Sequence, residues 1–155
     1  MWQTSKFNGI ELNNKEAHVW LVNIDQQTHK INNYWRVLNS EEQQKANLFK
    51  FEKDKSCYII ARAVLRILLG YYLAKPPESI VFKTIKNGKP FVDNLKDVQF
   101  NISHSKNCIL LGFVKKHQIG IDVEYTKRPI EVELIAKSFF AEEEVNNLFA
   151  LDKCY

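Results

Sequence analysis

The chain has 155 residues, of which 45% are hydrophobic and 12% aromatic, and its formal net charge is +4. This composition excludes a disordered chain, and the length allows one or two compact units. The three cysteines are widely spaced and form neither a zinc pattern nor a disulfide framework, which favours a reducing, cytoplasmic compartment. We expect no signal peptide, because residues 1–14 lack an apolar segment, and no run long enough to span a bilayer.

The first predicted elements are a strand at residues 19–24 and a long helical region. Ser40 is a plausible helix N-cap, with Gln43 three residues later in a capping-box pattern. The helix is predicted to continue to about Ala74, with a break near residues 52–55, and Pro76-Pro77 ends it. Apolar residues recur at helical spacing in its second part and are predicted to be core: Ile60, Val64, Ile67 and Tyr71.

The middle of the chain reads as strands. Residues 80–85 predict a strand, Asn87-Gly88 a tight turn, and residues 91–92 a short continuation. Alternation then predicts an antiparallel pair around a turn at residues 105–107, with the returning strand at 108–114. A further strand is predicted at residues 119–125, followed by two helices, at 131–140 and 142–151.

The run Gly120-Ile-Asp-Val-Glu124 carries two carboxylates on one face of the predicted strand, because side chains at i and i+2 project the same way. Asp122 and Glu124 would lie roughly 7 Å apart at Cβ, close enough to share a cation. Mg²⁺ suits such a site, since it takes one or two carboxylates plus phosphate oxygens and water. The alternative is an ordinary half-exposed strand with acidic outer residues.

Ser103 and His104 are predicted at the end of a strand, where a hydroxyl and an imidazole can both donate to phosphate oxygens. The alternative is a turn-capping serine beside a surface histidine. The two side chains should point to opposite faces, so His104 cannot simply deprotonate Ser103. Arg62 and Arg66 stand four residues apart on one helix face, where they could bind a phosphate or form a solvated basic surface.

An ordered set of motifs resembles the 4′-phosphopantetheinyl transferases of the Sfp type. It comprises an arginine-containing helix at 61–70, Asn-Gly-Lys-Pro at 87–90, Phe-Asn-Ile-Ser-His-Ser at 100–105, the Asp-x-Glu run and the helical segment at 135–140. The resemblance extends from about residue 40 to about residue 151. It implies an α+β fold of two pseudo-symmetric halves, with residues 1–117 as the first half and 118–155 as the beginning of the second.

The resemblance implies Mg²⁺-dependent transfer of 4′-phosphopantetheine from coenzyme A, the substrate, to a serine of an acyl or peptidyl carrier protein. Such transferases serve fatty acid, polyketide and nonribosomal peptide biosynthesis. Asp122 and Glu124 would hold the metal and, with His104, carry catalysis. The implied coenzyme A contacts are Lys45, Arg62, Gly88, Lys89, Pro90, Ser103 and His104.

The family's later Trp-x-x-Lys-Glu-x-x-x-Lys helix does not occur in this sequence. We therefore expect residues 1–155 alone to be inactive, and to self-associate or to require a complementary fragment. Lys127-Arg128 are expected either to face the acidic carrier protein or to form a solvated basic turn. The alternative is a non-catalytic module that binds coenzyme A or a carrier protein. We expect no membrane partner and no nucleic acid, because the sequence lacks an RNP-like aromatic motif or a basic stripe along a helix.

Overall fold

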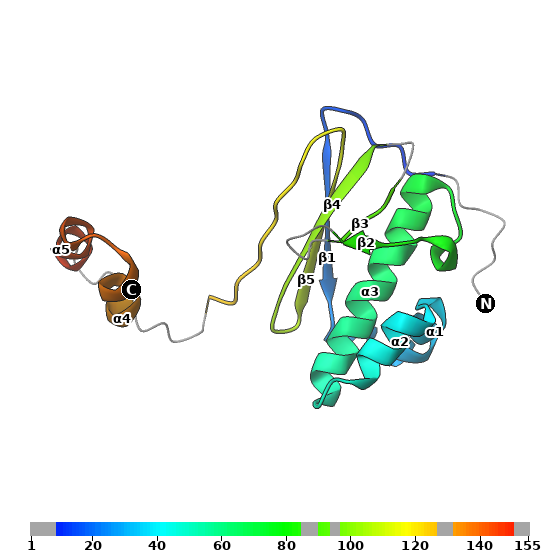
Figure 1. The fold of residues 1–155 in the computed structure, drawn as a ribbon, viewed down its shortest axis with the longest axis horizontal. Helices are drawn as coiled ribbons and strands as arrows, with labels where there is room; N and C mark the ends of the chain where they lie inside the picture. The colour runs from blue at the N-terminus through cyan, green and yellow to red at the C-terminus, as the bar shows by residue number, and fades with distance from the viewer. Residues whose placement is uncertain (1–8, 85–89, 94–96, 127–131, 151–155) are drawn as a thin grey trace. The chain divides into compact units, whose positions relative to one another are not determined.

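The computed structural model describes residues 9–84, 90–93, 97–126 and 132–150 (Figure 1). The chain divides into two compact units, Met1–Glu124 and Tyr125–Tyr155. The boundary between these units follows Glu124, whereas the sequence predicted a boundary between pseudo-symmetric halves after residue 117. Compactness does not test internal symmetry, so the division into halves stays a prediction.

Unit one is built on a three-stranded antiparallel sheet. Its strands are β1 (Ala17–Asn23), β4 (Val98–Ser105) and β5 (Cys108–Lys115), in the order β1-β5-β4. The central register aligns Trp20 of β1 with Leu111 of β5, which in turn faces Ile102 of β4. This confirms the predicted first strand and the predicted hairpin around the Ser-His motif. Strand β4 lies at one edge of this sheet.

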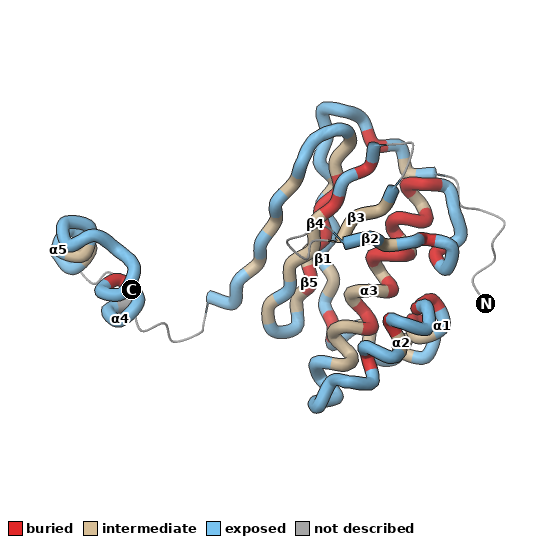
Figure 2. Tube along the Cα trace, in the orientation of Figure 1, coloured by how far each residue is buried: buried red, intermediate tan, exposed pale blue. Residues whose placement is uncertain are grey.

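The two faces of the sheet differ sharply in burial. The inner face packs against helix α3 through Val98, Phe100, Ile109, Leu111 and Phe113, all buried. Figures 1 and 2 show α3 along this face, with the buried residues concentrated between helix and sheet. On the outer face, Val19 and Leu21 of β1 are 58% and 70% exposed. The apolar residues of β1 thus do not all contribute to the core.

The helical region begins earlier than predicted. A 3-10 helix, η2 (Asp25–Lys30), leads into α1 (Ile31–Val37), and α2 (Ser40–Asn47) follows. The N-cap of α2 is Asn39, not Ser40: the Asn39 side chain accepts from the Glu42 backbone N–H, and the Glu42 carboxylate accepts from the Asn39 N–H. The capping box was therefore predicted one residue too late, because both positions carry residues that favour helix caps.

Helix α3 (Glu52–Leu73) is the core element of unit one. The break before it lies at residues 48–51, not at 52–55, and it ends where Ala74 adopts the left-handed conformation. Of the four predicted core residues only Ile60 is fully buried; the other three are half-buried, because the fully buried residues of the helix lie at the neighbouring positions. A 3-10 turn, η3 (Pro77–Ser79), follows α3.

Contrary to the sequence expectation, α3 has the length and hydropathy of a membrane-spanning helix. Its packing in unit one accounts for that apolar character, because core helices of folded domains share it. A second sheet pairs β2 (Lys83–Thr84) with β3 (Pro90–Phe91). Within the described residues β2 begins later than the strand predicted at 80–85, and β3 lies one residue before the predicted continuation at 91–92. The predicted turn at Asn87-Gly88 lies outside the described residues.

Unit two contains α4 (Val132–Phe139) and α5 (Glu142–Ala150) within its described part. Both predicted helices are confirmed, although the first ends at Phe139, one residue before the predicted end. Residues 131 and 151 lie outside the described residues. Ser138 donates to the Leu134 carbonyl one turn earlier, and the Ala141 N–H donates to Glu144 at the start of α5. Ala136 is 1% exposed, whereas Phe139 is 82% exposed.

Candidate functional site

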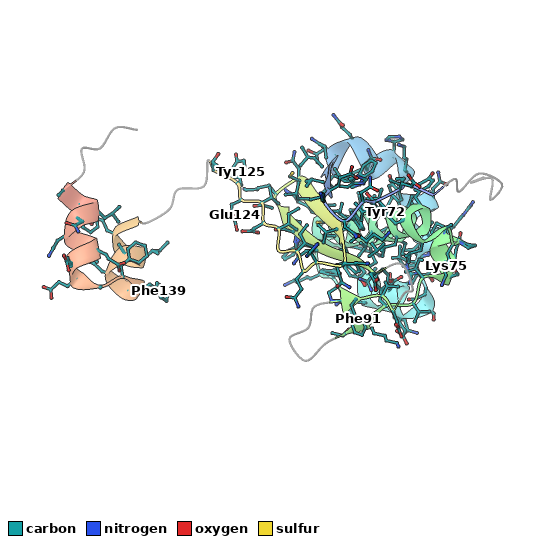
Figure 3. The ribbon with its side chains drawn as sticks, turned by 90° about the horizontal axis from the view of Figure 1, so that it is seen from above. Tyr72, Lys75, Phe91, Glu124, Tyr125 and Phe139 are labelled. Atoms are coloured by element: carbon teal, nitrogen blue, oxygen red, sulfur yellow. The ribbon has the colours of Figure 1, made fainter. Side chains whose placement is uncertain are left out.

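The carboxylate segment, residues 119–124, is extended and follows β5 through a short turn. The predicted alternation is confirmed: Ile119, Ile121 and Val123 are half-buried, whereas Asp122 and Glu124 are exposed. The prediction of a sheet strand is wrong, because this described segment belongs to neither sheet. Figure 1 shows it running along the sheet on the side away from α3, and Figure 3 shows Glu124 at its end.

The apolar side of this segment packs against Gly112 of β5. A Cβ atom at residue 112 would lie 2.7 Å from Ile119 Cδ1 and 3.1 Å from Ile121 Cδ1. Both distances are shorter than ordinary carbon contacts, so the two isoleucine side chains lie closer to the sheet than they could beside a Cβ atom without shifting. The close approach anchors one side of the segment, and any larger residue at position 112 would have to displace these isoleucine side chains.

Polar side chains of β4 hold the other side. The Ser103 hydroxyl donates to Asp122 Oδ1 at 2.6 Å and accepts from the Val123 N–H at 3.2 Å. Ser105 donates to Glu124 Oε2 at 3.4 Å. Two residues before Ser103, the Asn101 amide donates to the Ile119 carbonyl at 3.3 Å. Side chains thus take the place of the backbone ladder that the sequence predicted.

The two carboxylates fit a magnesium site that is completed by a substrate. No group of three or more His, Cys, Asp or Glu suited to a metal occurs among the residues that the structure describes. Asp122 and Glu124 nevertheless provide oxygen ligands at exposed, neighbouring positions. The serine hydrogen bonds use one oxygen of each carboxylate and leave the second oxygen for a cation. Mg²⁺ accepts such a pair when phosphate oxygens and water supply its other ligands.

His104 lies on the opposite face of β4 from Ser103, as the alternation predicted, and it is exposed. Because β4 is the edge strand, a ligand lying along that edge can reach both faces. Phosphate binding by Ser103 stays a prediction, and it would compete with the bond to Asp122, since a hydroxyl has one proton to donate. Gly88 and Lys89 lie outside the described residues, and Pro90 is half-buried in β3.

Arg62 and Arg66 do not form a shared phosphate site. Arg66 is fully buried: its Nε donates to Glu42 Oε2 at 2.7 Å, and its Nη1 donates to the carbonyls of Pro77 and Ile80. Arg62 donates to Glu42 Oε1. Its guanidinium carbon lies 3.7 Å from the centroid of the Phe82 ring. Only Arg62, at 21% exposure of its side chain, remains within reach of a ligand.

Glu42 stays ionised although it is buried. Burial by itself would raise the pKa of Glu42, but the hydrogen bonds from Arg66 and Arg62 outweigh it and hold the pKa below its ordinary value of 4.5. Lys45, on the exposed side of the same helix, lies with its ammonium 5.6 Å from the Tyr58 ring centroid. No described hydrogen bond or ion pair links Lys45 or Arg62 to His104 or Asp122, so the cofactor contacts stay predictions.

Three residues of this region were missed at the level of sequence: Glu42, Asn101 and Ser105. The signal for the last two was present, because alternation places Asn101, Ser103 and Ser105 on one face of a strand. No comparable signal marked Glu42, because it stands 20 residues from Arg62 and 24 from Arg66.

Comparison with known proteins agrees with this architecture. A family model described as 4′-phosphopantetheinyl transferase, N-terminal, matches residues 25–116. The chain is 32% identical over 145 residues to the 4′-phosphopantetheinyl transferase HetI of Nostoc sp., covering 92% of this chain and 61% of that protein. It is 34% identical over 120 residues to the 4′-phosphopantetheinyl transferase Sfp of Bacillus subtilis, covering 77% of this chain and 52% of Sfp.

A solved structure shows the same fold. It is a holo-(acyl-carrier-protein) synthase from Bacillus anthracis in complex with coenzyme A (3′,5′-ADP), with a TM-score of 0.50 at 14% identity. The superposition covers 63% of this chain and 91% of the synthase. The chain thus spans between half and two thirds of the length of the two sequence relatives. Because the family model covers more than half of it, the chain belongs to the 4′-phosphopantetheinyl transferase family.

Proposed function

We propose that this chain takes part in the Mg²⁺-dependent transfer of 4′-phosphopantetheine from coenzyme A to a serine of an acyl or peptidyl carrier protein. The observation that carries this proposal is the exposed pair Asp122 and Glu124, which lies beside the edge strand that bears His104. Two carboxylates and an imidazole thus lie at one edge of the sheet, which supports the proposal because these groups suit a metal ion and a phosphate oxygen. The family membership supplies the reaction class.

In this proposal Asp122 and Glu124 hold Mg²⁺, which when bound offsets charge on the coenzyme A pyrophosphate. His104 donates to a phosphate oxygen from the edge of β4. Lys45 and Arg62, with Lys89 beyond the described residues, provide positive charge for the remaining phosphates. The chain's own part in such a reaction is positioning and charge neutralisation, which dominate phosphoryl-type transfers.

Titration calorimetry with coenzyme A, with and without Mg²⁺, tests the binding half of this proposal. We expect Mg²⁺ to strengthen coenzyme A binding by the parent chain. In the variants Asp122→Asn and Glu124→Gln we expect Mg²⁺ to have no such effect. Glu11→Gln, at an exposed glutamate of the same unit, is the matched control. A metal effect of equal size in all four proteins would contradict the proposed metal site.

Mass spectrometry of an apo carrier protein tests the transfer itself. The chain is incubated with coenzyme A, Mg²⁺ and a polypeptide that carries the Trp-x-x-Lys-Glu-x-x-x-Lys helix. We expect the carrier serine to gain one phosphopantetheine group, and Asp122→Asn to abolish that gain. Coenzyme A binding without any labelling would instead support the alternative, a non-catalytic binding module.

A further inference from the structure

Three polar residues of β4 contact the carboxylate segment at regular intervals. Asn101, Ser103 and Ser105 stand two residues apart, so they share the outer face of the strand. Each makes a side-chain hydrogen bond to the segment, at the Ile119 carbonyl, at Asp122 and at Glu124 respectively. The three contacts follow the same order along both stretches of chain, so together they fix the register between them.

Ser103 makes the central and most constrained of these contacts. Its hydroxyl donates its one proton to Asp122 and accepts the Val123 N–H. The hydroxyl thus bridges the carboxylate and the next backbone amide, which fixes Asp122 relative to its own main chain. At 2.6 Å the bond to Asp122 has the length of a charge-assisted hydrogen bond. Keeping it leaves the hydroxyl no proton to donate to a phosphate.

We propose that Asn101, Ser103 and Ser105 form a clamp that positions Asp122 and Glu124 for a divalent cation. Ser103 is then a positioning residue that acts through Asp122. It does not donate a hydrogen bond to a phosphate. The inference rests on the proposed function for its cation, whereas the clamp itself is a property of the metal-free chain. Ile119 and Ile121, seated over Gly112, anchor the opposite side of the segment.

The physical advantage of a side-chain clamp is preorganisation. A segment held only by its backbone ends would lose conformational freedom when its carboxylates bound a metal, and that loss would weaken binding. With one oxygen of each carboxylate already bonded to a serine, the second oxygen is oriented before the metal arrives. Partners of this kind typically change metal affinity about 10- to 100-fold.

Hydrogen exchange on the metal-free chain tests the clamp. In Ser103→Ala the Val123 amide should exchange about tenfold faster than in the parent, because one hydrogen bond is worth about that factor. Ser103→Thr keeps a hydroxyl and should restore the slow exchange. Ser79→Ala, which removes a local hydroxyl bond to the Pro76 carbonyl, is the control and should leave Val123 unchanged. An unchanged Val123 rate in Ser103→Ala would overturn the clamp.

Calorimetry with coenzyme A then separates the two roles of Ser103. A positioning role predicts that Ser103→Ala weakens Mg²⁺ binding in the presence of coenzyme A about tenfold or more, and leaves metal-free coenzyme A binding unchanged. If Ser103→Ala binds coenzyme A more weakly in the absence of metal, Ser103 donates a hydrogen bond to a phosphate and the positioning role is overturned. An unchanged Mg²⁺ affinity in Ser103→Ala would also overturn it. A parent chain that binds no Mg²⁺ with coenzyme A would refute the proposed function, while the exchange experiment would still decide whether the clamp exists.

Discussion

Arg66 and Glu42 form a buried ion pair that ties three elements together. The Arg66 side chain is fully buried, its Nε donates to Glu42 of α2, and its Nη1 binds two carbonyls at and just after η3. Arg62 binds the second oxygen of the same carboxylate. One glutamate therefore binds two arginines of α3, with one negative charge between two positive ones, and it connects α2 to the core helix.

Glu42→Gln should destabilise the fold strongly. The amide keeps the size of the side chain but leaves the buried Arg66 charge without a counterion, and breaking such a pair costs about 3–5 kcal/mol. Chemical denaturation followed by circular dichroism measures the change. Glu41→Gln, at the exposed neighbouring position, is the control and should stay within about 0.5 kcal/mol of the parent. Equal midpoints for the two variants would contradict the role of the ion pair.

The same carboxylate predicts a dependence of stability on pH. Its pKa is lower in the folded state than the ordinary 4.5, so below 4.5 the unfolded chain binds a proton that the folded chain does not. The contribution of Glu42 is therefore complete above pH 4.5 and is lost as the pH falls toward the folded-state pKa. The stability difference between parent and Glu42→Gln should narrow over that window in denaturation curves. If the difference in unfolding free energy between the parent and Glu42→Gln does not change with pH below 4.5, the pKa of Glu42 is not lowered in the folded state.

The start of α2 offers a direct comparison between two candidate caps. Asn39→Ala removes the acceptor for the Glu42 N–H and should cost about 1 kcal/mol of unfolding free energy. Ser40→Ala, at the cap favoured by the sequence pattern, lies inside the helix and should change stability by less than about 0.5 kcal/mol. Thermal and urea unfolding measure both. A larger loss in Ser40→Ala would place the cap at Ser40 after all.

The proposed phosphate contacts predict a preference among coenzymes. If Arg62, Lys89 or His104 meets the 3′-phosphate, the chain should bind coenzyme A more tightly than 3′-dephospho-coenzyme A. The alanine variant that removes the contact should reduce the ratio of the two affinities about tenfold, because a charge-assisted hydrogen bond contributes about that factor. Lys75→Ala, at an exposed lysine two residues beyond the end of α3 (Figure 3), is the control and should not change this preference. Equal affinities of the parent for both coenzymes would remove the basis of these contacts.

Local patterns predicted the β4–β5 hairpin well, because residue alternation and the turn at 105–107 are encoded within one short stretch. Alternation likewise predicted which side of residues 119–124 carries the carboxylates. The same pattern could not show that the segment lies outside the sheet, since an extended chain held by side chains alternates just as a strand does. The helical residues 25–37 were not predicted at all, because their polar stretches lack a clear apolar period.

The sequence by itself determined the family, the helix-and-sheet fold class and the position of Asp122 and Glu124 on one side of the extended segment. Each of these follows from ordered motifs and near-neighbour spacing. Only the tertiary structure decided what those groups contact. These contacts join residues that are far apart in sequence or on separate elements. They are Glu42 with two arginines, Ser103 with Asp122, and Gly112 with two isoleucines. Such contacts arise from packing of whole elements, and no local period or spacing records which side chains that packing brings together.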